Sequence, residues 1–198
     1  MEVTRIFDLL AYYKNQFKPK DDAVAGKVDG EWVKYSIDQY IEIANNISYA
    51  LMKLGVRKGD KIASISNSRP EWNFLDMGIL QAGAVHVPIY PTISKADYKY
   101  ILAQSEVKYL FVSGPDLYRK IENFLPENTN ILDVYSFNKI DGVKHLDQLL
   151  ELGRSNADPG ALATIKDAVD PHDIATLIYT SGTTGIPKGV LLSHDNII

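Results

Sequence analysis

Short apolar strands alternate with amphipathic helices from residue 61 to about residue 135, and this alternation constrains the fold more than any other feature. The strand-like runs are 61–66, 84–87, 109–112 and 131–135, and the helical patterns between them are 70–82, 94–104 and 115–125. Ser68 and Glu71 mark the start of the first of these helices, with Pro70 in its first turn. Strands joined by helices of this length predict an α/β fold, with a mostly parallel sheet covered by helices on both faces.

A longer helix precedes the alternating region. Apolar residues recur at three-to-four spacing over residues 36–54, which predicts one buried helix face. Ser36 and Gln39 have the spacing of a capping box, and Gly55 supplies a stop signal. Before this helix, Asp29-Gly30 lies between two β-prone runs and predicts a hairpin.

The chain divides into four regions. We expect an N-terminal helix and hairpin at 1–35, an α/β region at 36–152, a surface connection at 153–172 and a strand–loop–strand segment at 173–198. The connection contains polar turn residues and predicts one short helix near 161–168. Residues 193–198 read as the start of another helix, so we expect the chain to be the first part of a longer protein.

Composition excludes several classes of protein. The sequence contains no cysteine, which excludes disulfides, iron–sulfur clusters and Cys-based zinc sites. Its 21 Lys+Arg and 25 Asp+Glu residues give a net charge of −4, and no basic block indicates a nucleic-acid partner. The N-terminus lacks the apolar stretch of a signal peptide. The longest uncharged run, 77–94, contains two prolines, so we expect no transmembrane segment and a cytoplasmic protein, with peripheral membrane contact left open.

The densest group of ligand-binding residue types follows the clear strand at 174–179. The candidate phosphate-binding residues are Thr180, Ser181, Gly182, Thr183, Thr184, Gly185 and Lys188. Glycines let backbone N–H groups approach an anion, hydroxyls donate hydrogen bonds to it, and the lysine adds a positive charge. The segment therefore predicts a loop that can hold a triphosphate, followed by a further strand that begins at Gly189.

Three other interpretations of this loop are possible from residue types alone. A Walker A loop requires glycine before its lysine and a hydroxyl residue after it, but Pro187 and Gly189 occupy these positions. A nucleophile elbow around Ser181 requires a glycine where Tyr179 stands. The third interpretation, a glycine-rich hairpin without a ligand, is left open by composition alone.

Residues 179–194 resemble the signature loop of the adenylate-forming superfamily, which includes acyl-CoA synthetases, luciferases and peptide-synthetase adenylation domains. Upstream segments are similar to the N-terminal part of the same family: 59–63, 69–72, 82–85 and 87–94. The last of these segments, Val87-Pro88-Ile89-Tyr90-Pro91-Thr92-Ile93-Ser94, most resembles long-chain fatty acyl-CoA synthetases. The similarity extends from about Ser36 to the last residue and makes the ligand-free interpretation of the loop unattractive.

The resemblance implies a chemistry. Such enzymes join a carboxylate to ATP, release pyrophosphate and leave an acyl-adenylate, and then pass the acyl group to the thiol of coenzyme A; for this chain the resemblance implies a fatty acid. It implies that 180–188 hold the β- and γ-phosphates and that Thr184 joins the shell of a Mg²⁺ ion, which prefers hard oxygen ligands. The family places its acidic metal ligand, adenine pocket and adenylation lysine further along the chain. We therefore expect no catalytic residue within this chain, and no activity from it alone.

Two further functions stay open. In the first, the enzyme adenylates an aryl acid or an amino acid instead of a fatty acid. In the second, the chain is a non-catalytic nucleotide-binding module. The four histidines, His86, His145, His172 and His194, lack metal-binding spacing and have no carboxylates arranged around them in the sequence. We expect all four to be structural, with His86 in a core strand and His194 supporting the phosphate loop.

Overall fold

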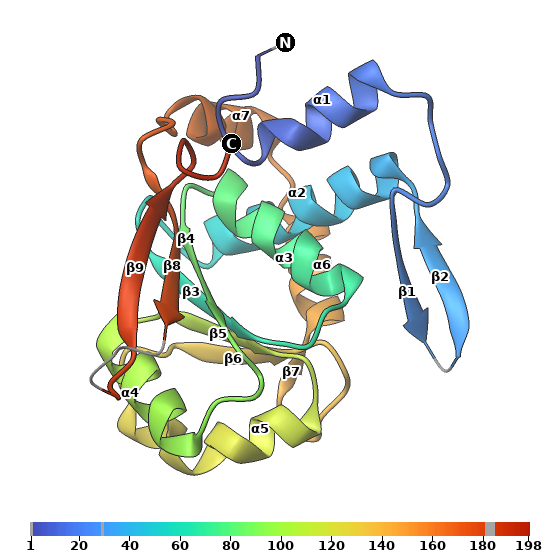
Figure 1. Cartoon of the computed structure of the whole chain (residues 1–198). Helices are drawn as coiled ribbons and strands as arrows, with labels where there is room; N and C mark the ends of the chain where they lie inside the picture. The colour runs from blue at the N-terminus through green and yellow to red at the C-terminus, as the bar shows by residue number, and fades with distance from the viewer. Residues whose placement is uncertain (1, 29, 181–184) are drawn as a thin grey trace.

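A computed structural model describes residues 2–28, 30–180 and 185–198 (Figure 1). The strands are β1 (Val24–Val28), β2 (Glu31–Tyr35), β3 (Lys61–Ile65), β4 (Val85–Ile89), β5 (Tyr109–Val112), β6 (Asp133–Ser136), β7 (Lys144–His145), β8 (Ile174–Thr180) and β9 (Lys188–Ser193). The helices are α1 (Asp8–Gln16), α2 (Ile37–Lys53), α3 (Pro70–Gln81), α4 (Lys95–Ser105), α5 (Pro115–Ile121), the 3-10 helix η1 (Glu122–Glu127), α6 (Leu146–Ser155) and α7 (Pro159–Asp167).

Seven of the strands form one sheet, in the order β7-β6-β5-β3-β4-β8-β9. Neighbouring strands from β7 to β8 are parallel, whereas β9 runs antiparallel to β8. The predicted α/β fold with a mostly parallel sheet is confirmed. The order in which strands are added to the sheet changes side at β3. β4 is added on one side of β3, and β5 is added on the other.

Helices cover both faces of this sheet (Figure 1). Ile47 of α2, Phe74 of α3 and Leu149 of α6 belong to the apolar cluster on one face. Tyr98 of α4 and Ile121 of α5 belong to the cluster on the other face. The central strands β3, β4 and β5 are therefore buried from both sides, which explains why they are nearly continuously apolar, whereas most of β9 is exposed.

Local sequence signals place several helix starts. Ser36 accepts a hydrogen bond from the Gln39 backbone N–H at 3.2 Å, and the Gln39 side chain accepts one from Ser36 N at 2.8 Å. Ser94 and Asp97 form the same reciprocal arrangement at the start of α4. These capping boxes satisfy amide groups that the first turn leaves without helical partners, and they confirm the predicted helices at 36–54 and 94–104.

The two-stranded ribbon of β1 and β2 confirms the predicted hairpin, with Gly30 at φ 86° in the turn. Only glycine adopts such a positive φ without strain, so this residue sets the turn. The inner face of the ribbon approaches the start of α3, where a Cβ on Gly26 would lie 2.6 Å from Cδ of Pro70.

Three details differ from the expectation. The residue before α3 is Arg69, which makes no side-chain cap, so Ser68 is not the capping residue. The helix expected at 115–125 ends at Ile121 and tightens into η1, which contains Pro126. The strand expected to begin at residue 131 begins at Asp133.

The connection after α6 is partly helical. α6 continues to Ser155, and the short helix expected near 161–168 is α7, which begins at Pro159 behind an Asp158 cap. After β9, the predicted helix start at 193–198 is a single turn. Ser193 N donates to Asn196 Oδ1 at 3.1 Å, and Asn196 N donates to Ser193 Oγ at 3.3 Å. None of the helices in the described ranges has the length and apolar character needed to cross a bilayer.

Candidate functional site

The predicted phosphate loop connects β8 to β9. The two strands pair from Ile174 opposite Ser193 to Thr180 opposite Lys188, so Thr180 and Lys188 close the ladder at the loop end. Both residues are exposed, and Gly185 inside the loop has a φ of 80°. The predictions at Ser181, Gly182, Thr183 and Thr184 fall outside the described residues. The structure therefore brings Thr180 and Lys188 together and places Gly185 between them in the chain.

Side chains along β8 alternate between the two faces of the sheet. Leu177 and Tyr179 belong to the buried cluster on the α4 side. Ile178 faces the other side, where it lines a cavity together with Trp72 of α3. Because side-chain direction has a period of two, Thr180 and its partner Lys188 lie on the same face as Ile178. The hydroxyl and the ammonium group are thus presented on the side of this cavity.

We call this hollow the Trp72 cavity. Its volume is about 670 Å³, and it lies at the carboxyl ends of β3, β4 and β8. Its lining includes Ser66, Asn67, Arg69, Trp72, Asn73, Ile89, Tyr90, Thr92 and Ile178. Open parallel sheets bind ligands at this edge, and a volume of several hundred Å³ suits a small molecule. The sequence analysis did not select Trp72 as a ligand-binding residue, because its place beside β8 depends on the strand order.

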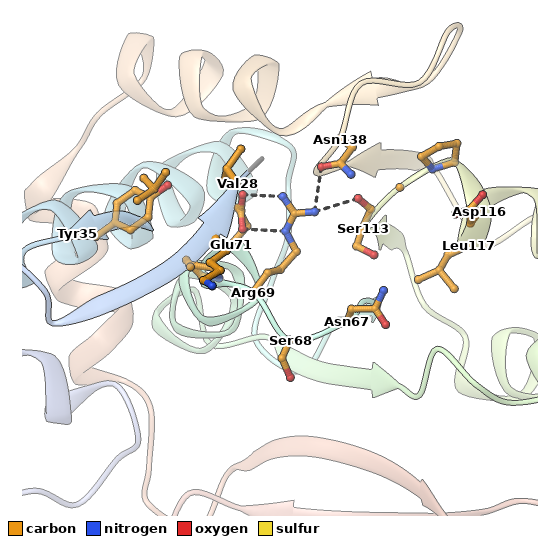
Figure 2. Close-up of a pocket in the computed structure, with 16 residues that line it drawn as sticks. Val28, Tyr35, Asn67, Ser68, Arg69, Glu71, Ser113, Asp116, Leu117 and Asn138 are labelled. Atoms are coloured by element: carbon orange, nitrogen blue, oxygen red, sulfur yellow. Dashed lines mark hydrogen bonds and ion pairs between the residues drawn. The ribbon is translucent and has the colours of Figure 1, made fainter. Parts of the chain in front are cut away.

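A second cavity of about 430 Å³, the Val28 cavity, lies between the β1–β2 hairpin and the carboxyl ends of β3 and β5 (Figure 2). At its floor, Arg69 donates to both carboxylate oxygens of Glu71 at 2.8 and 2.7 Å. The same guanidinium donates to Ser113 O at 3.1 Å and to Asn138 Oδ1 at 3.0 Å. Arg69 therefore ties together the segments that follow β3, β5 and β6.

The ion pair at this floor changes the acidity of Glu71. Burial by itself raises the pKa of this carboxyl group, but the hydrogen bonds and positive charge of Arg69 outweigh burial and leave the pKa below its ordinary value. Glu71 is therefore ionised at neutral pH, and the guanidinium is occupied by protein partners. We assign the Arg69–Glu71 pair a structural role.

The expectation that no carboxylates are arranged around the histidines is wrong, because His86 lies beside Asp76, His145 beside Asp147 and His172 beside Asp195. The shortest of these contacts belongs to His86. Its Nδ1 lies 2.6 Å from Asp76 Oδ1, and its Nε2 lies 2.8 Å from Ser64 Oγ. This order of groups resembles a nucleophilic triad. However, Ser64 is fully buried and His86 is 1% exposed, so no substrate reaches the hydroxyl. The structural role expected for His86 holds. In the part of the chain that the structure describes, no three His, Asp or Glu side chains gather as a metal site.

His194 connects the end of β9 to the N-terminal segment. Its Nδ1 accepts a hydrogen bond from Ile6 N at 3.2 Å, and its ring meets Phe7 edge-on. Burial lowers the pKa of His194, although the nearby Asp173 carboxylate acts in the opposite direction. The imidazole is thus neutral at pH 7 and anchors residues 6 and 7, whereas the sequence suggested support of the phosphate loop.

The fold, the strand–loop–strand segment and the cavity at the carboxyl edge agree with one family. The AMP-binding enzyme family matches residues 13–198, and this chain belongs to that family.

Its curated relatives include fatty acyl-CoA ligases. The chain is 38% identical over 177 residues to the long-chain-fatty-acid–CoA ligase FadD15 of Mycobacterium bovis, covering 86% of this chain and 28% of that protein. It is 32% identical over 180 residues to fatty acyl-CoA synthetase A of Dictyostelium discoideum, covering 86% of this chain and 26% of that protein. The chain thus spans little more than a quarter of the length of these relatives.

Solved structures show the same fold. The anthranilate CoA ligase AuaEII, in complex with anthranoyl-AMP, has a TM-score of 0.77 at 22% identity, over 96% of this chain and 35% of that one. The Mycobacterium tuberculosis fatty acyl CoA synthetase has a TM-score of 0.70 at 24% identity, over the same shares. VinN, in complex with L-aspartate, has a TM-score of 0.70 at 23% identity, over 96% of this chain and 48% of that one.

Proposed function

We propose that this chain is the N-terminal, phosphate-binding part of an ATP-dependent long-chain fatty acid–CoA ligase. In that reaction a carboxylate oxygen of the acid attacks the α-phosphorus of ATP, and pyrophosphate leaves. The thiol of coenzyme A then takes the acyl group, and AMP leaves. The observation that carries the proposal is the exposed Thr180–Lys188 pair, which closes the β8–β9 ladder at the signature loop.

Each part of the loop has a proposed task. The ammonium group of Lys188 and the hydroxyl of Thr180 bind oxygens of the β- and γ-phosphates and stabilise the charge on departing pyrophosphate. Ser181, Gly182, Thr183, Thr184 and Gly185 complete the cradle with hydroxyls and backbone N–H groups, a role assigned from the sequence.

Mg²⁺ would neutralise part of the phosphate charge in this reaction. A threonine hydroxyl such as that of Thr184 is a hard oxygen ligand, which fits this ion. The described residues offer no cluster of three acidic or histidine side chains. We propose that the loop contributes the Thr184 hydroxyl to the ion, and that phosphate oxygens and water supply others, as Mg²⁺ commonly accepts.

The acid is proposed to be a long-chain fatty acid because the curated relatives carry that activity in their names. Structural neighbours with an anthranoyl or an aspartate ligand keep aryl and amino acids as alternatives. The proposed location is the cytoplasm, with peripheral membrane contact open because the substrate is a lipid.

ATP–pyrophosphate exchange by the complete protein that carries this chain tests the function. The acids to compare are palmitate, benzoate and aspartate. Exchange that depends on palmitate supports the proposal. Exchange only with benzoate or aspartate would contradict the fatty-acid assignment and favour an aryl or amino acid as the substrate. ATP binding without exchange for any acid would favour a non-catalytic nucleotide-binding module.

A further inference from the structure

Tyr179, the residue before Thr180 in β8, makes a hydrogen bond to helix α4. Its hydroxyl donates to Oε1 of Gln104. The tyrosine ring is 7% exposed and belongs to the apolar cluster beneath α4, whereas Gln104 lies at the surface near the end of that helix. In Figure 1, α4 lies beside the loop end of β8 and β9. This bond joins the helix to the strand at the point where the strand enters the loop.

The tyrosine ring also contacts the opposite strand. Tyr179 pairs with Gly189, one register position before the Thr180–Lys188 pair. A Cβ on Gly189 would lie 3.3 Å from Cζ and 3.4 Å from Cε1 of Tyr179, so the ring lies directly against the glycine backbone. Leu177 of β8 packs on the same side, with its Cδ1 2.8 Å from the same Cβ position, so the ring and this leucine together cover Gly189 next to Lys188.

We propose that Gln104 is a positioning residue for the phosphate loop. By accepting the Tyr179 hydrogen bond, it holds the ring against Gly189 and so fixes the spacing of Thr180 and Lys188. Gln104 and Tyr179 lie on the α4 face of the sheet, opposite the face that presents Thr180 and Lys188, and neither contacts the phosphates. The inference rests on the proposed ATP-binding function of the loop.

Steady-state kinetics of the complete protein test this role through three variants. Tyr179→Phe and Gln104→Ala each remove one partner of the bond, whereas Gln104→Glu keeps an acceptor oxygen. A hydrogen bond of about 0.5–1.5 kcal/mol corresponds to a change of roughly 2- to 12-fold. We expect both removals to raise KM for ATP by that factor, with KM for the acid unchanged and Gln104→Glu close to wild type.

A double variant separates positioning from general damage. If the bond is the cause, Tyr179→Phe/Gln104→Ala raises KM for ATP no more than either single change. Tyr109→Phe is a matched control, because it removes a 3.2 Å bond from a buried tyrosine to Leu54 O, far from the loop in the fold. It should lower stability without changing KM for ATP. Additive effects in the double variant, or an equal rise of KM for ATP in the control, would overturn the positioning role.

The outcome for Lys188→Ala distinguishes failure of the proposed phosphate site from failure of the proposed role of Gln104. If KM for ATP is unchanged in Lys188→Ala, the proposed phosphate site fails, and the positioning role fails with it. If Lys188→Ala raises KM and Gln104→Ala does not, only the role of Gln104 is overturned. Amide hydrogen exchange without ATP gives an independent readout, and Gln104→Ala should speed exchange in residues 188–192.

Discussion

Nδ1 of His86 lies 2.6 Å from Oδ1 of Asp76, and this contact joins strand β4 to helix α3 inside the fold. The other ring nitrogen extends the connection to Ser64 in β3. On the opposite side, Thr176 of β8 donates to the backbone carbonyl of His86 at 2.9 Å. A chain of polar contacts therefore runs across three adjacent strands and onto the helix that lines the Trp72 cavity.

Replacing His86 should strongly destabilise the protein. His86→Ala removes one buried and one partly buried hydrogen bond and leaves Ser64 and Asp76 without this partner, at a cost of about 3 kcal/mol in the free energy of unfolding. Urea denaturation measures this change. His172→Ala is the matched control, because the His172 side chain is 81% exposed and its loss should change stability by less than about 0.5 kcal/mol. Equal effects of the two substitutions would contradict a structural role for the His86 contacts.

Gly153 is the residue at which α6 packs against α2. A Cβ at this position would lie 1.8 Å from the backbone oxygen of Asn46, so no side chain fits without moving a helix. We expect Gly153→Ala to lower the free energy of unfolding by at least about 2 kcal/mol. In α7, a Cβ on Gly160 would meet only Asp158 Oδ1 at 3.5 Å. Gly160→Ala should leave stability unchanged or raise it by up to about 1 kcal/mol. Thermal melts of the two variants give the comparison.

The buried imidazole of His194 should make stability depend on pH below neutrality. Its pKa is lowered in the folded state, so the unfolded chain binds this proton at higher pH than the folded chain does. Stability therefore falls as pH drops below about 6.5, the ordinary histidine pKa, and continues to fall until the folded pKa is reached. We expect His194→Gln to lose less stability than wild type between pH 7.5 and 5.5. If the free energy of unfolding falls equally with pH in both proteins, the His194 proton does not cause the loss of stability.

Local signals in the sequence predicted most of the fold. The capping boxes at Ser36 and Ser94 depend on residues three positions apart, and the hairpin was predicted from Asp29-Gly30 and the β-prone runs beside it. The strand–loop–strand segment was likewise visible, because the residues of its loop are consecutive. Thr180 and Lys188 could therefore be selected before their pairing was known.

Contacts between distant segments could not be predicted in this way. His86 and Asp76 are ten residues apart, and only the packing of α3 on β4 brings them together. Gln104 and Tyr179 are 75 residues apart, and although Tyr179 begins the signature segment, no local pattern pairs it with Gln104. The Trp72 cavity depends on the strand order β3-β4-β8, which the alternation of strands and helices does not determine.

The 198 residues by themselves should not form an acyl-adenylate. The proposed role of the loop is to bind phosphates, and the chain spans little more than a quarter of the length of its curated relatives. We expect the purified chain to show no ATP–pyrophosphate exchange above background with palmitate. Measurable exchange would mean that the residues present are sufficient for the first step.

The central claim is that Lys188, at the mouth of the β8–β9 hairpin, binds the phosphates of ATP. The most direct measurement is the rate of ATP–pyrophosphate exchange by the complete protein carrying Lys188→Ala, with Lys99→Ala on the surface of α4 as the matched control. A charge-assisted hydrogen bond of about 1.5–3 kcal/mol predicts a loss of roughly 10- to 150-fold in kcat/KM for ATP. The control, which removes only an exposed pair with Glu127, should stay within about twofold of wild type. An unchanged kcat/KM for ATP in Lys188→Ala would contradict the phosphate-binding role.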